Sequence, residues 1–171
     1  MRYRIAPAAT LLAALALAAC SGRDAVLAPV APPAPRGDVA TAVAPPTVYF
    51  SEIHYDNVGA DADERIEITG PAGTDLSGWQ VVLYNGNGGV TYNTQTLSGT
   101  IPATCGANGV VVLTYPADGI QNGSPDGMAL VNGGGQVVEF LSYEGTFAAT
   151  NGPALGMTAV DIGVLEQSFR G

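Results

Sequence analysis

The chain has 171 residues, with 15 acidic residues against six arginines and no lysine, and a formal net charge of −9 at pH 7. A chain with a negative net charge repels a phosphate backbone, because nucleic-acid binding depends on cationic side chains that displace counterions. The composition therefore argues against nucleic acid as a partner for this segment alone.

The N-terminus has the layout of a secretory signal. Arg2 and Arg4 precede an uncharged apolar run, Ile5 to Ala19, and a positive region followed by an apolar region is typical of such signals. The run is shorter than the roughly 20 residues that a transmembrane helix requires. We therefore interpret residues 1–19 as a signal peptide rather than a permanent membrane span.

The apolar run ends in Leu17-Ala18-Ala19-Cys20, which resembles the lipobox of bacterial lipoproteins. The resemblance implies cleavage before Cys20 and attachment of lipid to that cysteine, so the expected location is the cell envelope, with a membrane as partner. Ser21 follows the cysteine, which in such lipoproteins usually implies sorting to the outer membrane. The alternative is an ordinary secretory signal that is cut near Ala19.

A proline-rich segment follows Cys20. It carries six prolines among alanines and valines and has no helical or strand periodicity: Pro29, Pro32, Pro33, Pro35, Pro45 and Pro46. In a polyproline II conformation of about 3.1 Å per residue it would reach roughly 80 Å. We interpret residues 20–46 as the lipidated cysteine and a tether.

Residues 47–171 consist of short apolar or β-branched runs between Gly, Asn, Asp and Pro, which predicts one all-β domain. Seven strands are expected: Val48–Tyr55, Arg65–Thr69, Trp79–Tyr84, Tyr92–Ser98, Val110–Tyr115, Met128–Val131 and Gln136–Tyr143. Seven strands suit a β-sandwich. The Gly- and Asn-rich segments 85–89 and 132–135 predict hairpin turns.

Four segments of this region occur in an order that resembles the lamin-tail domain: Ser51-Glu52-Ile53, Glu64-Arg65-Ile66-Glu67-Ile68, Asp75-Leu76-Ser77-Gly78-Trp79 and Asp126-Gly127-Met128-Ala129-Leu130. The resemblance implies an immunoglobulin-like β-sandwich of the lamin-tail type. Bacterial members are commonly exported and act as non-catalytic attachment or recognition modules, often beside nuclease or phosphatase domains.

The family pattern continues with a further strand or two, so we expect a sandwich that lacks its last strand or strands. Such a sandwich would leave an uncovered edge near Gln136–Tyr143 and an unfilled apolar groove, and uncovered edges recruit other chains. We therefore expect the chain to self-associate.

Three residues of the Asp-Leu-Ser-Gly-Trp segment are expected to be structural. Trp79 begins an apolar strand, and we expect its indole to fill the centre between the sheets. Asp75 can accept hydrogen bonds from nearby backbone N–H groups, and Gly78 can adopt the φ that the turn requires.

No catalytic residue is predicted. His54 is the only histidine, and no Gly-x-Ser-x-Gly segment accompanies it to supply a nucleophile. A phosphate-binding Gly-x-x-x-x-Gly-Lys loop is excluded because the chain has no lysine. The sequence therefore favours a protein that is not an enzyme.

One polar cluster is a candidate calcium site. It supplies five oxygen donors within nine residues: Asp56, Asn57, Asp61, Asp63 and Glu64. Ca²⁺ binds six to eight such oxygens, although the spacing is not that of an EF-hand. A second oxygen-rich loop, from Asp118 through Asn122 to Asp126, would add ligands if it lay at the same end of the sandwich. The alternative is a solvated acidic loop.

Two functions are compatible with these features. The first is a non-enzymatic, lipid-anchored module that binds a protein or glycan at the cell envelope. The second is the targeting domain of an exported nuclease or phosphatase whose catalytic domain is not in this chain.

The lipid anchor gives the first prediction. Cells grown with a labelled fatty acid should incorporate label into the wild-type protein and not into Cys20→Ala, because the acyl chains need the thiol and the amino group of that residue. Label that persists in the variant would contradict the assignment.

Overall fold

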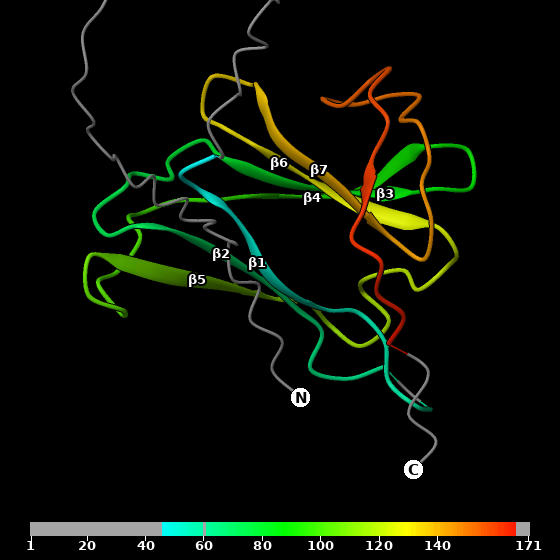
Figure 1. Cartoon of the computed structure of the whole chain (residues 1–171), viewed down its shortest axis with the longest axis horizontal. Helices are drawn as coiled ribbons and strands as arrows, with labels where there is room; N and C mark the ends of the chain where they lie inside the picture. The colour runs from blue at the N-terminus through cyan, green and yellow to red at the C-terminus, as the bar shows by residue number, and fades with distance from the viewer. Residues whose placement is uncertain (1–45, 60, 167–171) are drawn as a thin grey trace, which may run out of the picture. The chain divides into compact units, whose positions relative to one another are not determined.

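The computed structural model describes residues 46–59 and 61–166, so the predicted signal peptide, Cys20 and almost all of the tether lie outside the described residues. The described part is all-β and consists of two sheets packed face to face (Figure 1). This arrangement confirms the predicted sandwich and is consistent with an immunoglobulin-like fold. The described residues include no helix long and apolar enough to span a bilayer.

The smaller sheet is antiparallel and has the order β1-β2-β5, with β1 at Tyr49–His54, β2 at Arg65–Pro71 and β5 at Asn108–Thr114. The larger sheet has the order β4-β3-β6-β7-β8. Its strands are β4 (Val90–Thr96), β3 (Gln80–Asn85), β6 (Asp126–Val131), β7 (Val137–Tyr143) and β8 (Val160–Asp161). All seven predicted strands are present, whereas β8 was not predicted.

The main core lies between the two sheets. Alternate residues of a strand point to opposite faces, so Val81 and Leu83 of β3 and Leu130 of β6 project from the larger sheet into this core. They meet Ile66 and Ile68 of β2, which are fully buried. We call this set the inner cluster.

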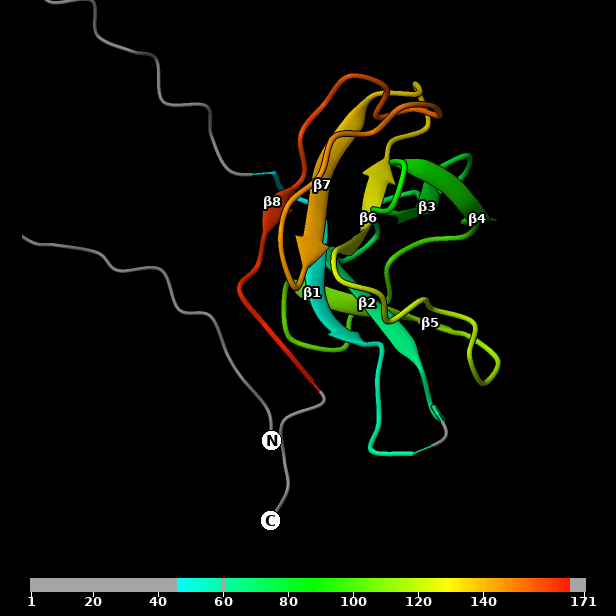
Figure 2. The same cartoon turned by 90° about the vertical axis from the view of Figure 1, so that its right-hand side faces the viewer.

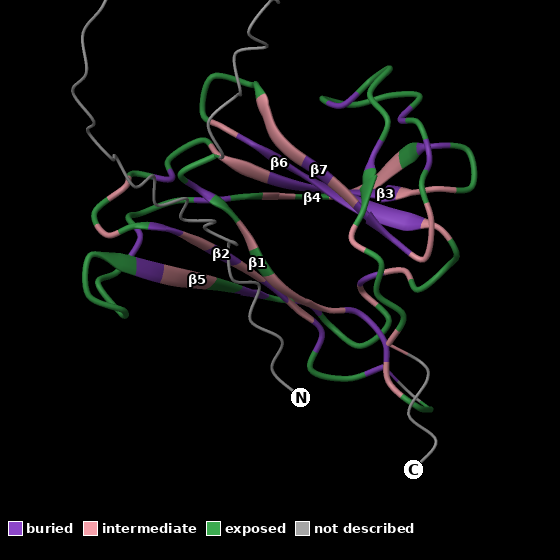
Figure 3. Ribbon diagram, viewed as in Figure 1, coloured by how far each residue is buried: buried purple, intermediate pink, exposed green. Residues whose placement is uncertain are grey.

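The outer face of the larger sheet is also covered. Val82 and Ala129 project there and pack with Phe147, Ala149 and Ala154 of the connection between β7 and β8. Figures 1 and 2 show this orange connection running past β7 toward β3 and β4. Because both faces of β3 and β6 are buried (Figure 3), these strands are continuous apolar runs rather than alternating ones.

Hydrogen bonds hold the covering connection against β3. The Tyr84 hydroxyl donates to the Asn151 carbonyl at 3.3 Å and accepts from the Ala154 N–H at 3.0 Å. A Cβ at Gly152, whose φ is +66°, would lie 2.7 Å from this hydroxyl oxygen. Burial raises the pKa of Tyr84, so the phenol stays neutral and can serve as both donor and acceptor.

The predicted turn before β3 is confirmed. Asp75 Oδ1 accepts hydrogen bonds from the Ser77 N–H at 2.9 Å and from the Ser77 hydroxyl at 2.7 Å. These bonds lower the pKa of Asp75. Gly78 has a φ of +78°, which a residue with a side chain rarely adopts.

The predicted central position of Trp79 is wrong. Trp79 precedes β3 and is only partly buried, packing against the inner cluster from its margin. The largest fully buried side chains are Tyr55, Tyr84 and Tyr143. The turn ends one residue before β3 begins, and this leaves the indole at the end of the sheet rather than between the sheets.

The predicted uncovered edge is wrong at the C-terminal end of β7. There, β8 pairs with β7 in parallel, with Leu141 opposite Val160 and Ser142 opposite Asp161. Near the other end of β7, Glu139 accepts a hydrogen bond from the Phe50 N–H at 2.7 Å. β7 is therefore an inner strand over Leu141 and Ser142.

The revised position of Trp79 gives a prediction about stability. Leu83→Ala should cost about 2–5 kcal/mol, as for other truncations in a closed core, whereas Trp79→Ala should cost about 1–2 kcal/mol because part of the indole is already in water. Denaturant unfolding of both variants measures the difference. A larger loss for Trp79→Ala would place the indole in the core after all.

Candidate functional site

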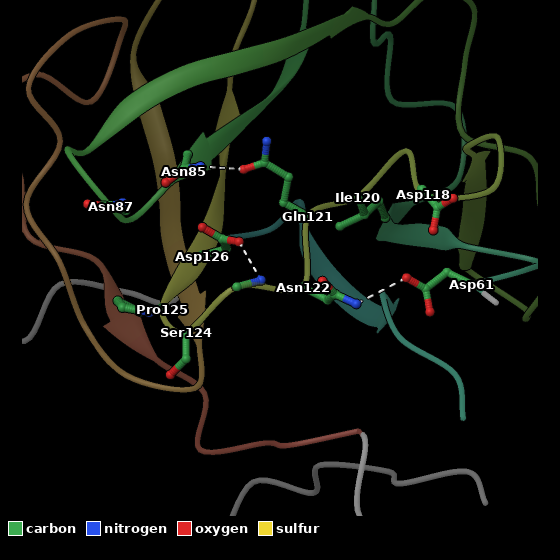
Figure 4. A pocket seen from close by; sticks show the side chains of 11 residues that line it. Asp61, Asn85, Asn87, Asp118, Ile120, Gln121, Asn122, Ser124, Pro125 and Asp126 are labelled. Carbon is green, nitrogen blue, oxygen red and sulfur yellow. Dashed lines mark hydrogen bonds between the residues drawn. The ribbon is translucent and has the colours of Figure 1, made fainter. Parts of the chain in front are cut away.

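A polar groove of about 580 Å³ lies at one end of the sandwich (Figure 4). It is formed where β3 ends at Asn85 and β6 begins at Asp126, two residues that are opposite each other in the sheet. Its wall also includes the loops between β1 and β2 and between β5 and β6. Most lining side chains are amides or carboxylates: Asp61, Asn85, Asn87, Asp118, Gln121, Asn122 and Asp126, with Ile120, Gly123, Ser124 and Pro125 between them.

One side of the groove is positioned by the buried carboxylate of Glu64. This side chain is fully buried, and it accepts hydrogen bonds from the N–H groups of Gly119 at 2.7 Å and Ile120 at 3.1 Å. The Glu64 carbonyl also accepts from the Tyr115 N–H at 2.9 Å. Three amides of the segment that follows β5 are thus bound to one residue at the start of β2.

The other side of the groove is positioned by Asp126, which is also buried. Its Oδ2 accepts from the Gly123 N–H and its Oδ1 from the Gly86 N–H, each at 2.8 Å. Burial raises the pKa of Asp126, and the two N–H bonds oppose that effect. A Cβ at Gly86 would collide with the Pro125 carbonyl, so the turn after β3 packs directly against the β5–β6 loop.

Two tyrosines, the partly buried Tyr92 and the buried Tyr143, bind the backbone of the same loop. The Tyr92 hydroxyl accepts from the Gln121 N–H at 2.9 Å, and the Tyr143 hydroxyl donates to the Gln121 carbonyl. Burial raises the pKa of Tyr92 to about 12 and raises that of Tyr143 further. Both phenols therefore remain neutral at ordinary pH, and the backbone of Gln121 is held on both sides.

Several polar groups of the residues that line the groove make no hydrogen bond within the described part of the chain. The Asn85 amide donates to Gln121 Oε1 at 2.7 Å, while Asn85 Oδ1 is buried without a hydrogen-bond partner. Among the hydrogen bonds of residues 46–59 and 61–166, none involves the side chains of Asn87 or Asp118 or the amide nitrogen of Gln121. The groove thus combines fixed walls with unused donors and acceptors.

The five predicted calcium ligands do not converge. The Glu64 carboxylate is occupied by two backbone amides, and Asp63 is exposed with a φ of +57°. Asn57 Oδ1 accepts from the Ala62 N–H at 2.7 Å. Within the described ranges, no group of three His, Cys, Asp or Glu side chains could hold a metal ion.

The second oxygen-rich loop does lie at the same end, as the calcium hypothesis required. Asn122 Nδ2 lies 3.1 Å from Asp61 Oδ2 and 3.4 Å from Asp56 Oδ1. The predicted ligands therefore divide into two groups. Asp56 and Asp61 face Asn122, whereas Asn57, Asp63 and Glu64 serve the loop itself or face solvent.

His54 is a strand-end residue, with Nδ1 3.4 Å from Glu166 Oε1 and Nε2 3.0 Å from Asn57 Nδ2. Glu166 Oε2 also accepts from the N–H groups of Tyr55 and Asp56. These contacts join the segment after β8 to the end of β1. They fix the position of His54 at the end of β1.

Sequence reasoning assigned most of the groove residues to other roles. Asp61 and the loop from Asp118 to Asp126 were candidate calcium ligands, and Asn85 and Asn87 were turn formers. Gln121 was not singled out within its loop. From the sequence we considered that the loops after β1 and β5 meet at one end of the sandwich. The same reasoning, applied to the turn after β3, would have placed these side chains together.

No protein-family model, curated protein or solved structure matches the chain. The lamin-tail resemblance thus stays a prediction from the four sequence segments.

Proposed function

We propose that this chain is a non-enzymatic binding module, exported and anchored by lipid at Cys20, that binds a neutral glycan in the groove at the end of its sandwich. The lamin-tail resemblance supports the class, because the bacterial members are recognition or attachment modules. The polar side chains that line the groove support the choice of a glycan as the ligand.

The observation that carries the proposal is a set of side-chain amide and carboxylate groups in the wall of the groove that make no hydrogen bond. The Gln121 amide nitrogen and the side chains of Asn87 and Asp118 line the groove and have no partner among the described residues. Sugar hydroxyls both donate and accept, so neighbouring hydroxyls can pair with one amide or one carboxylate. Because Glu64 and Asp126 hold the backbone in place, little ordering cost is left for binding.

The charge distribution favours a neutral sugar over an anionic one. Thirteen of the 15 acidic residues lie between Pro46 and Glu166, where Arg65 is the only arginine. That arginine pairs with Glu52 at 3.2 Å. Uronic acids, sulfated sugars and nucleic acids would all meet a like-charged surface.

The proposal predicts retardation of the full chain in native gels that contain a neutral polysaccharide. A panel of β-glucan, galactomannan, arabinoxylan, amylose and dextran would be compared with anionic hyaluronate. Asn87→Ala and Gln121→Ala together should weaken binding about tenfold, since each lost hydrogen bond contributes roughly 0.5–1.5 kcal/mol.

Gln136→Ala is the matched control, because Gln136 is exposed in the turn between β6 and β7, at the opposite end of the larger sheet. It should leave the retardation unchanged. Mobility that no neutral polysaccharide alters, or an equal loss in Gln136→Ala, would contradict the assignment of the groove.

A further inference from the structure

Two buried carboxylates meet beside the groove. Asp56 and Asp61 are each only 5% exposed, and both face the amide of Asn122, which comes from the loop on the other side. Figure 4 shows the Asn122–Asp61 contact. One neutral amide thus stands between two groups that carry negative charge when ionised.

The Asp56 carboxylate lacks the hydrogen bonds that its burial demands. Its Oδ2 is buried and has no partner, and its Oδ1 has only the 3.4 Å contact to Asn122. Asp61 is better satisfied, since its Oδ1 accepts from the Asn57 N–H at 3.0 Å. A buried carboxylate without partners costs several kcal/mol unless a cation or a proton compensates it.

Neither carboxylate has a cationic side chain as its partner in the described residues. Arg65 pairs with Glu52, and His54 pairs with Glu166. No side chain of the described residues therefore supplies the compensating charge, and a bound cation would supply it.

We propose that Asp56 and Asp61 bind one Ca²⁺ ion, with Asn122 as a third ligand. Rotation of the Asn122 side-chain amide by about 180° exchanges its nitrogen for its oxygen, so that the amide faces the ion with Oδ1. Asn122 is exposed, and water therefore completes the coordination from the groove side. This set differs from the five residues expected from the sequence, of which it retains only Asp56 and Asp61.

The donor chemistry favours calcium. All three ligands are hard oxygens from irregular loops, which suits the variable geometry of Ca²⁺ better than the strict octahedron of Mg²⁺. Zinc prefers histidine and cysteine ligands, which this cluster lacks. With two carboxylates and water ligands, the dissociation constant should lie near the millimolar end of the range for protein sites, about 10⁻⁴–10⁻³ M.

The ion would join the β1–β2 loop to the β5–β6 loop. Both loops line the groove, so calcium would stiffen a wall that Glu64 and Asp126 already hold. The inference stands whether or not the groove binds a glycan, because it rests on Asp56 and its missing partners.

Thermal unfolding of the full chain tests the proposal. A ligand that binds only the native state raises its Tm, here by about 5 °C at a calcium concentration ten times the dissociation constant. The Tm in calcium should be higher than the Tm in magnesium at equal concentration and the Tm in chelator. Calorimetric titration should give one calcium ion per chain. Coincident melts would overturn the proposal.

Three variants locate the site. Asp61→Asn should abolish the calcium shift, whereas Asp63→Asn should keep it, because Asp63 lies in the same loop but faces solvent. Asp56→Asn should abolish the shift and also raise the Tm in chelator, since it removes the unpaired buried charge. A full calcium shift in Asp56→Asn, or its loss in Asp63→Asn, would overturn the assignment.

Discussion

The buried carboxylate of Glu64 is the interaction on which the groove end of the sandwich depends. It accepts the N–H groups of Gly119 and Ile120. The Gly119 N–H also donates to the Pro116 carbonyl at 2.9 Å, whereas the buried Ile120 N–H has Glu64 as its one acceptor among the described residues. Hydrogen bonds to a charged acceptor contribute about 1.5–3 kcal/mol each, and an orphaned buried donor costs a similar amount. These hydrogen bonds stabilise the observed position of the loop from Pro116 to Pro125.

Asp126 holds the other end of the loop that Glu64 binds. Its two oxygens bind Gly123 at the far end of the same loop and Gly86 in the turn after β3. The groove is thus framed by two buried carboxylates that accept hydrogen bonds from backbone amides. They hold the loops that carry the side chains of Asn87 and Gln121.

The strands and hairpins could be predicted from the sequence, because apolar runs and Gly-Asn turns are local signals. The two-residue β8 could not, since Val160–Asp161 has no pattern of its own and its pairing depends on the path of the preceding connection. Trp79 was misplaced because a single apolar position does not reveal whether it lies at the centre or the margin of a sheet. Glu64 was interpreted as a calcium ligand because its true partners are 55 and 56 residues away in the chain.

Amide hydrogen exchange at Gly119 and Ile120 tests most directly whether the Glu64 carboxylate holds the groove. Both backbone amides should be protected from exchange in the wild-type chain. The backbone amides of Asn87 and Asp118, which are exposed residues of the groove, should exchange faster. In Glu64→Gln, one carboxylate oxygen becomes a donor, and the protection of at least one of the two amides should fall about tenfold or more. Wild-type amides that exchange freely, or full protection in the variant, would contradict the account.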